Sequence, residues 1–205
     1  MAKKGVEEAQ EQAWELLAGR DPKSVCERAA VAYAEESARY TVTSFGQDVQ
    51  VDLASRTLSC ESPLGSLMLG RLGYFSRIGI LHYLLHAQSL PASGQWVAPG
   101  DLASGQLYFR GSHILPTEPL AKAYGDALER FRARGKALGG HALDYGDAAV
   151  RLLPLPRLPV ALVLWRGDDE FPARASLLFD ATCEGHVAAD ILWSTAMLSV
   201  LMFLS

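Results

Sequence analysis

The chain has 205 residues, of which 49% are hydrophobic and 20% charged, and its formal net charge is −4. This balance is typical of a folded globular protein and excludes wholesale disorder. The excess of acidic over basic residues argues against a nucleic-acid partner or an anionic membrane surface. We expect one α+β domain over residues 1–205, in which residues 1–36 form an N-terminal helical element.

The cysteines and the apolar segments indicate a cytoplasmic protein. The three cysteines, Cys26, Cys60 and Cys183, stand far apart without a CxxC pair, as expected for reduced thiols. The first ten residues are polar and lack the apolar core of a signal peptide. The longest uncharged apolar run, residues 191–204, is shorter than the ~20 residues that a membrane-spanning helix needs.

The first third predicts two helices followed by strands. Apolar residues recur at helical spacing from Val6 to Leu17. Asp21 before Pro22 is a strong helix start, and we expect the second helix to run to about Ala34. From Tyr40 to Cys60 the apolar residues alternate with polar ones, which predicts a meander of two or three antiparallel strands.

The middle third predicts two further helices separated by a packed loop. A third helix is expected from Gly73 to Ala87. A fourth is expected from Thr117 to Leu138, capped by Thr117 and ended by two glycines at 139–140. The segment 91–112 between them is rich in turn residues yet contains aromatic side chains, so we expect a packed loop with at most one short strand.

The last third contains the clearest strand signals. Strands are predicted at 150–155 and 160–165, and an acidic turn leads to a hairpin partner at 175–179. An apolar helix over 186–203 should be buried in the fold or in a contact with a second copy. The sequence therefore predicts an α+β fold: a mainly antiparallel sheet of about five or six strands with helices packed on it.

Two histidines on the third helix form a candidate metal pair. His82 and His86 lie four residues apart, so their imidazoles share one helix face. They can bind a metal or tetrapyrrole only with a third ligand from elsewhere, His113 or His141. The glutamate of an HExxH zinc site is absent, and His82 also fits a stripe that faces the core.

Acidic residues surround the last predicted strand. Asp168, Asp169 and Glu170 form the turn before it, and Asp180 ends it. Such carboxylates can bind a cation through oxygen, or one can act as a general base if a neighbour raises its pKa. The alternative is structural, because acidic residues favour hairpin tips and Asp180 can cap the following turn.

The loop residues Trp96, Arg110 and His113 form a candidate ligand-binding group. Arg110 offers a bidentate guanidinium to a small anion, and His113 follows it closely. An ordinary exposed loop is the alternative interpretation. Neither GxGxxG nor the P-loop pattern occurs, which disfavours nucleotide hydrolysis and Rossmann dinucleotide binding.

The C-terminal third resembles a known family. The run LPRLPVALVLWRGDDEFPARASLLF, residues 155–179, followed by Asp180, is similar to the hallmark of the family called domain of unknown function 3786. The resemblance draws attention to Trp165 with the acidic residues of the turn, but it assigns them no role. It implies members in anaerobic bacteria and archaea, some with an appended four-cysteine iron–sulfur domain. This chain has no such cysteine cluster.

Three functional hypotheses follow. The first is a cytoplasmic, non-catalytic accessory module that binds a small cofactor, whose identity the sequence does not reveal, or a protein partner in anaerobic metabolism. The second is an enzyme that uses the acidic hairpin for metal-assisted or acid–base chemistry. The third is a structural module that self-associates through its C-terminal helix. No recognisable catalytic constellation occurs in the sequence, which favours the first.

Overall fold

The computed structural model describes residues 2–105, 109 and 113–205 and confirms the α+β class. The helices are α1 (Ala2–Ala18), α2 (Pro22–Ala29), α3 (Pro63–Leu69), α4 (Gly73–His86), α6 (Thr117–Tyr124), α7 (Leu128–Ala137) and α8 (Ala189–Leu204). The strands are β1 (Ala32–Ala34), β2 (Arg39–Ser44), β3 (Gln47–Asp52), β4 (Thr57–Ser59), β5 (Trp96–Val97), β6 (His141–Leu143), β7 (Ala148–Leu155), β8 (Leu158–Trp165) and β9 (Arg174–Asp180). These strands form two antiparallel sheets.

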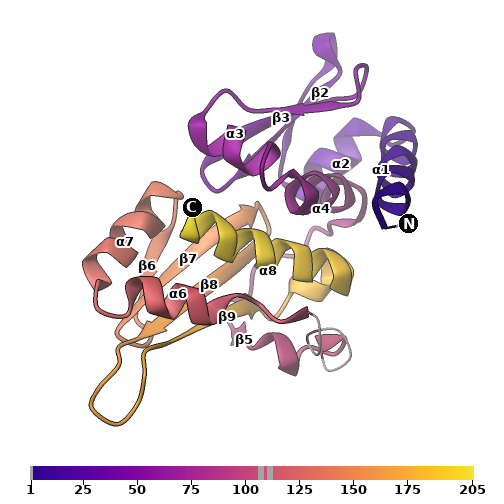
Figure 1. Cartoon of the computed structure of the whole chain (residues 1–205). Helices are drawn as coiled ribbons and strands as arrows, with labels where there is room; N and C mark the ends of the chain where they lie inside the picture. Colours follow the sequence, from indigo (N-terminus) through magenta and orange to yellow (C-terminus); the bar gives the residue numbers. More distant parts are fainter. Residues whose placement is uncertain (1, 106–108, 110–112) are drawn as a thin grey trace.

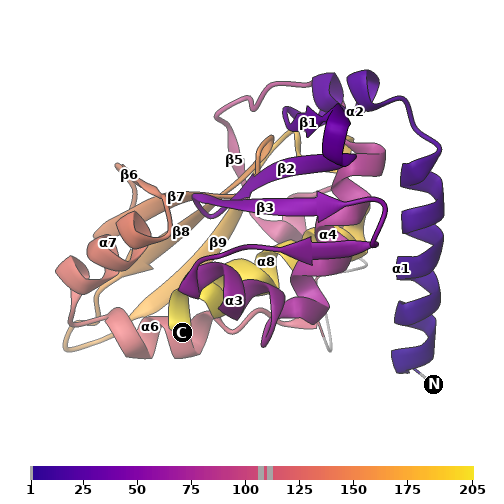
Figure 2. The ribbon, with the colours of Figure 1, turned by 90° about the horizontal axis from the view of Figure 1, so that it is seen from above.

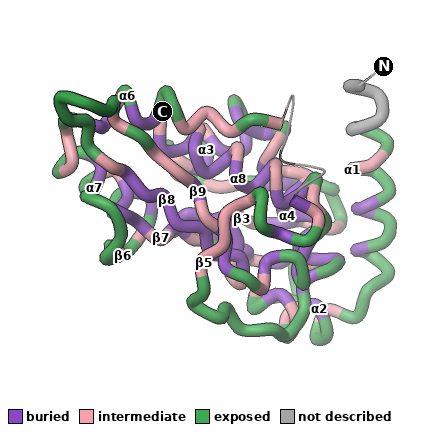
Figure 3. Tube along the Cα trace, turned by 90° about the horizontal axis from the view of Figure 1, so that it is seen from below, coloured by how far each residue is buried: buried purple, intermediate pink, exposed green. Residues whose placement is uncertain are grey.

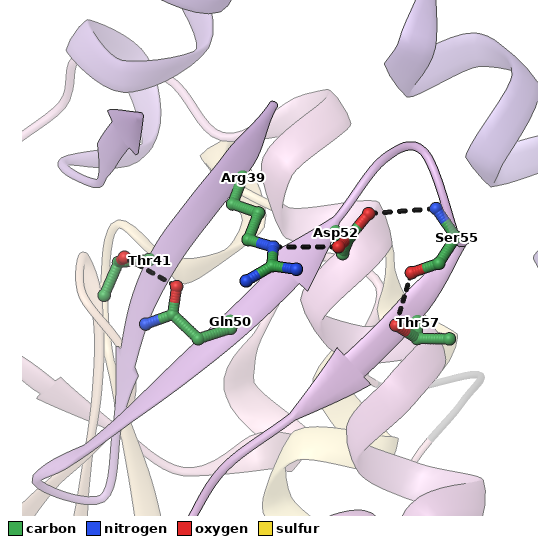
Figure 4. Close-up of polar contacts among 6 residues, drawn as sticks. All are labelled: Arg39, Thr41, Gln50, Asp52, Ser55 and Thr57. Carbon is green, nitrogen blue, oxygen red and sulfur yellow. Dashed lines mark hydrogen bonds and ion pairs between the residues drawn. The ribbon is translucent and has the colours of Figure 1, made fainter. Parts of the chain in front are cut away.

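The smaller sheet, in the order β1-β2-β3-β4, contains the meander predicted from the alternating pattern. One face is apolar and buried, whereas the other carries polar side chains paired across the strands (Figure 4). Arg39 donates to Asp52 over 2.8 Å, and Thr41 donates to Gln50 over 3.2 Å. These are directly opposed positions of β2 and β3, so the contacts support the register of the strands.

The larger sheet has the strand order β5-β9-β8-β7-β6. Its centre is β8, in which every residue except Trp165 is buried, as expected for a continuous apolar run. Helices α6, α7 and α8 lie on one face of this sheet (Figure 1). Helix α6 packs mainly on β9, α7 packs on β7, and α8 packs on β7 and β8.

Helix α8 is buried within the fold. It packs between α4, α6 and the larger sheet, and its buried side chains include Leu192, Ala196 and Phe203. Figure 3 shows the buried residues concentrated where the helices meet the sheet. This packing accounts for the apolar sequence of α8 without a second copy of the chain.

The two sheets meet at the end of β7 (Figure 2). The backbone N–H of Phe45 donates to the carbonyl of Leu153 over 2.8 Å, and the Ser44 hydroxyl donates to the Pro154 carbonyl over 2.7 Å. The β2–β3 turn also touches the turn after α7. A Cβ on Gly139 would lie 2.9 Å from the Cα of Gly46, so both positions require glycine.

The second helix is shorter than predicted. The Asp21 carboxylate caps it by accepting from the N–H of Ser24 over 2.9 Å, as expected. The helix ends at Ala29, because Ala30 adopts a left-handed conformation with φ of 52° and the chain then enters β1. The helix α3 and the short strands β1 and β6 were not predicted.

The predicted helix 117–138 is two helices, α6 and α7. The break follows Gly125, where an added Cβ would lie 2.5 Å from the Cβ of Ala173. Thr117 is the first helical residue, and the N-cap is Pro116, so the predicted Thr117 cap was wrong. The predicted stop was correct: α7 ends just before Gly139, whose φ is +70°.

Within the described part of the chain, no helix combines the length and the apolar character needed to cross a membrane.

The hydroxyl of Tyr83 joins α2, α4 and the turn between β7 and β8. It donates to the Ala29 carbonyl over 2.8 Å and accepts from the N–H of Arg157 over 2.9 Å. Tyr83 and Ala29 are fully buried, whereas Arg157 is partly buried, so the Ala29 carbonyl depends most on this hydroxyl.

We expect Tyr83→Phe to lower the free energy of unfolding by about 1–3 kcal/mol, because the buried Ala29 carbonyl and the Arg157 N–H both lose their partner. Urea denaturation measures the change. The control is Tyr145→Phe at an exposed position, which should change stability by less than about 0.5 kcal/mol. An equal effect in both variants would contradict this role of the Tyr83 hydroxyl.

Candidate functional site

The carboxylate of Asp180 is fully buried at the end of β9. It accepts hydrogen bonds from two neighbouring segments. The N–H and hydroxyl of Ser93 donate over 3.0 Å each, and the N–H of Gly94 donates over 2.7 Å. The N–H and hydroxyl of Thr182 donate over 3.0 and 2.7 Å. One carboxylate therefore fixes the start of the 93–105 loop and the turn after β9.

These donors also determine the charge state of Asp180. Burial of the carboxylate acts to raise its pKa, but the hydrogen bonds from Thr182, Ser93 and Gly94 outweigh burial and hold the pKa below its usual value. Asp180 is therefore ionised at neutral pH. A carboxylate surrounded by donors is a poor general base, because its proton affinity is lowered.

A second carboxylate, Glu184, anchors the far part of the same loop. Its side chain accepts from the N–H of Ala103 over 3.0 Å. It also accepts from the N–H and hydroxyl of Ser104, over 2.8 and 2.6 Å. Asp180 and Glu184 thus hold the loop against the β9–α8 connection at two separate points.

Between these anchors the loop pairs briefly with β9 and then leaves it. Trp96 lies opposite Asp180, and Val97 lies opposite Phe179. The pairing ends there because the next segment is a short 3₁₀ helix, η2 (Pro99–Asp101), and Pro99 has no N–H for a sheet hydrogen bond.

A cleft of about 280 Å³ opens where the loop leaves β9. Its walls come from the loop, from the segment before α6 and from four consecutive residues of β9. The lining residues are Ala98, Pro99, Gly100, Phe109, His113, Ile114, Leu115, Thr117, Ala175, Ser176, Leu177 and Leu178.

The cleft contains one of the three loop residues predicted to bind a ligand. His113 lines it, and the His113 ring packs edge-on against Trp193 with 5.1 Å between centroids. Trp96 is half-buried in β5, next to the cleft but outside its lining. Arg110 lies outside the residues that the structure describes.

The predicted acidic group is divided between the two ends of β9. Asp168 lies at the exposed hairpin tip and accepts from the N–H groups of Glu170 and Phe171, over 2.9 and 2.7 Å. These hydrogen bonds lower the pKa of Asp168. Asp180 lies at the other end of the strand, roughly 20 Å away at the usual rise per residue. Asp169 and Glu170 are exposed beside Asp168.

Trp165 belongs to the hairpin end of the sheet. The Arg174 guanidinium lies 4.1 Å from the centroid of the Trp165 ring, a cation–π contact between the opposed ends of β8 and β9. This contact gives Trp165 a structural partner, and the strand separates it from the cleft.

The two histidines of α4 are neighbours, with 5.7 Å between their ring centroids. His82 is half-buried and His86 is exposed. Burial lowers the pKa of His82, and the nearby His86 lowers it further. Among the described residues, no group of three or more histidine, cysteine or acidic side chains is placed to hold a metal.

Sequence reasoning missed the role of Glu184 and the walls of the cleft. Glu184 is exposed and belongs to no motif, so only the loop conformation reveals its partners. Its neighbour Cys183 is a buried thiol. Burial raises the pKa of Cys183 to about 12, with a smaller contribution from Glu184.

We expect Asp180→Asn to lower the free energy of unfolding by about 3 kcal/mol at pH 7. The asparagine NH2 group would face hydrogen-bond donors that now bind a carboxylate oxygen, and the negative charge that these donors stabilise would be lost. Asp169→Asn, at an exposed position, is the control and should change stability by less than about 0.5 kcal/mol. Denaturant titration of both variants provides the measurement.

Comparing Asp180→Asn with the parent protein also tests how stability depends on pH. The folded pKa of Asp180 is lowered, so its stabilisation is present above the unfolded value of about 3.9 and is lost as pH falls below it. The Asp180→Asn variant should therefore lose less stability than the parent between neutral pH and about pH 3. Parallel pH profiles for the two proteins would contradict a stabilising charge at this position.

Comparison with protein families adds one finding. A family model described as a domain of unknown function (DUF3786) matches residues 21–202. Searches of the curated proteins and of the solved structures each found no match. The matched region includes β9, Asp180 and the cleft beside them. The chain therefore belongs to the DUF3786 family.

Proposed function

We propose that the protein is a non-catalytic accessory module that binds a small cofactor or a segment of a partner protein in the cleft beside β9. The observation that carries this proposal is the cleft itself, which is lined on one side by a strand edge and on the other by apolar side chains. A concave, mostly apolar surface with a few polar groups is the usual form of a binding site.

The chemistry of the lining favours binding over catalysis. Of the described residues that line the cleft, His113 is the one with an ionisable side chain. Two carboxylates beside the loop, Asp180 and Glu184, accept hydrogen bonds from the loop that forms one wall. Their role in this proposal is to hold that wall in place.

The cellular setting of the proposal rests on sequence features. The widely spaced cysteines support a reducing cytoplasm. The resemblance to a family of anaerobic bacteria and archaea supports a role in anaerobic metabolism.

A photo-crosslinking amino acid at position 114 tests the proposal in living cells. Ile114 lines the cleft and is 73% exposed, so the replacement should not disturb the fold. Position 145, a tyrosine that is 49% exposed and does not line the cleft, provides the matched control. We expect adducts at 114 that are absent at 145, and mass spectrometry identifies them as small molecule or peptide. The same adducts at both positions, or none at either, would refute the proposal.

A further inference from the structure

The edge of β9 that faces the cleft carries backbone groups that no strand of the described residues pairs with. The N–H of Ala181 donates to the carbonyl of Gln95 over 2.8 Å. Because backbone groups alternate in direction along a strand, the odd-numbered residues of β9 point toward β5 and the even-numbered ones toward β8. Phe179 pairs with Val97 on the β5 side. Ala175 and Leu177 point the same way, beyond the end of β5.

No strand within the described residues pairs with β9 on this side between positions 174 and 178. The same stretch forms one wall of the cleft, because Ala175, Ser176, Leu177 and Leu178 all line it. The N–H and C=O groups of Ala175 and Leu177 therefore face the cleft, and Ala175 is the more exposed of the two, since Leu177 is 2% exposed. An edge of this kind pairs readily with another extended chain.

The opposite walls suit the side chains of such an extended chain. Phe109, Ile114 and Leu115 are apolar, and Phe109 packs edge-on against Phe179 of β9 with 5.9 Å between ring centroids. Side chains of an added strand project alternately to its two sides. Every second side chain of a bound peptide can therefore contact these apolar groups while its backbone pairs with β9.

We propose that the occupant of the cleft is an extended peptide segment of a partner protein, added to the larger sheet as a strand beside β9. This inference rests on the proposed function and specifies its ligand. The bound segment exchanges backbone hydrogen bonds with Ala175 and Leu177 and places apolar side chains against Phe109 and Ile114. Backbone pairing provides affinity in this mode of recognition, and the alternate side chains provide specificity.

The test uses dodecapeptides selected from a random displayed library against the full-length chain, followed by synthetic copies of the binders. Each synthetic peptide is N-methylated at one position at a time. If it binds as a strand, methylation of the amides that face β9 should weaken binding by about tenfold or more. Methylation of the intervening amides should have little effect. A binder without this alternation overturns the proposal, and so does a library without binders.

A pair of protein variants locates the binding site. Ala175→Pro removes an N–H that points into the cleft, and proline is tolerated at such an edge position. It should leave the melting temperature nearly unchanged and weaken peptide binding by about tenfold. Ser176→Pro removes an N–H directed toward β8 and should lower the melting temperature instead. Ala175→Val retains the N–H and should weaken binding less than Ala175→Pro does.

The remaining outcomes separate this inference from the proposed function. Crosslinking of a small molecule at position 114 with no peptide binding overturns the strand proposal and leaves the binding function intact. Peptides whose affinity is unchanged in Ile114→Asp bind elsewhere, which overturns the strand proposal and leaves the binding function to be decided by the crosslinking experiment. A dimer in sedimentation that is lost in Ala175→Pro assigns the edge to a second copy of the chain and overturns the partner peptide.

Discussion

The buried carboxylate of Asp180 determines where the loop, the edge strand and the start of the last helical segment meet. It accepts five hydrogen bonds, from the backbone or hydroxyl groups of Ser93, Gly94 and Thr182. Because burying an ionised group without partners is costly, the charge and its donors stabilise the structure only together. The loop that Asp180 holds pairs with β9 for two residues and then turns away at Pro99. The cleft is the space that this departure leaves along β9.

The fold was largely predictable where local chemistry decides it. Asp21 with Pro22 marked a helix start, and the apolar run of β8 marked a strand buried on both faces. The same start signal occurs at Ser62 and Pro63, where the serine caps α3, but the short segment that follows lacked a clear helical period. Between α6 and α7, Gly125 lies so close to Ala173 that a Cβ there would be only 2.5 Å from the Cβ of Ala173. A contact between residues so far apart in the chain has no local signal.

The residues of the candidate site were likewise predictable only in part. The sequence singled out Asp180, which is buried and hydrogen-bonded in the structure, and His113, which lines the cleft. It grouped Asp180 with Asp168, although one precedes the predicted strand and the other ends it. Strand geometry alone separates such positions. Glu184 and the apolar walls could not be predicted, since they depend on how the loop folds back on the β9–α8 connection.

Amide hydrogen exchange along β9 in the free protein is the most direct test of whether the edge beside the cleft is unpaired, because it reports backbone pairing one residue at a time. We expect slow exchange at Ser176 and Leu178, which face β8, and faster exchange at Ala175 and Leu177, which face the cleft, with Ala175 the fastest because Leu177 is buried. A bound peptide should then slow exchange at Ala175 and Leu177 selectively. Equal protection of all four amides in the free protein would show that the edge is already paired and that no peptide can add to it.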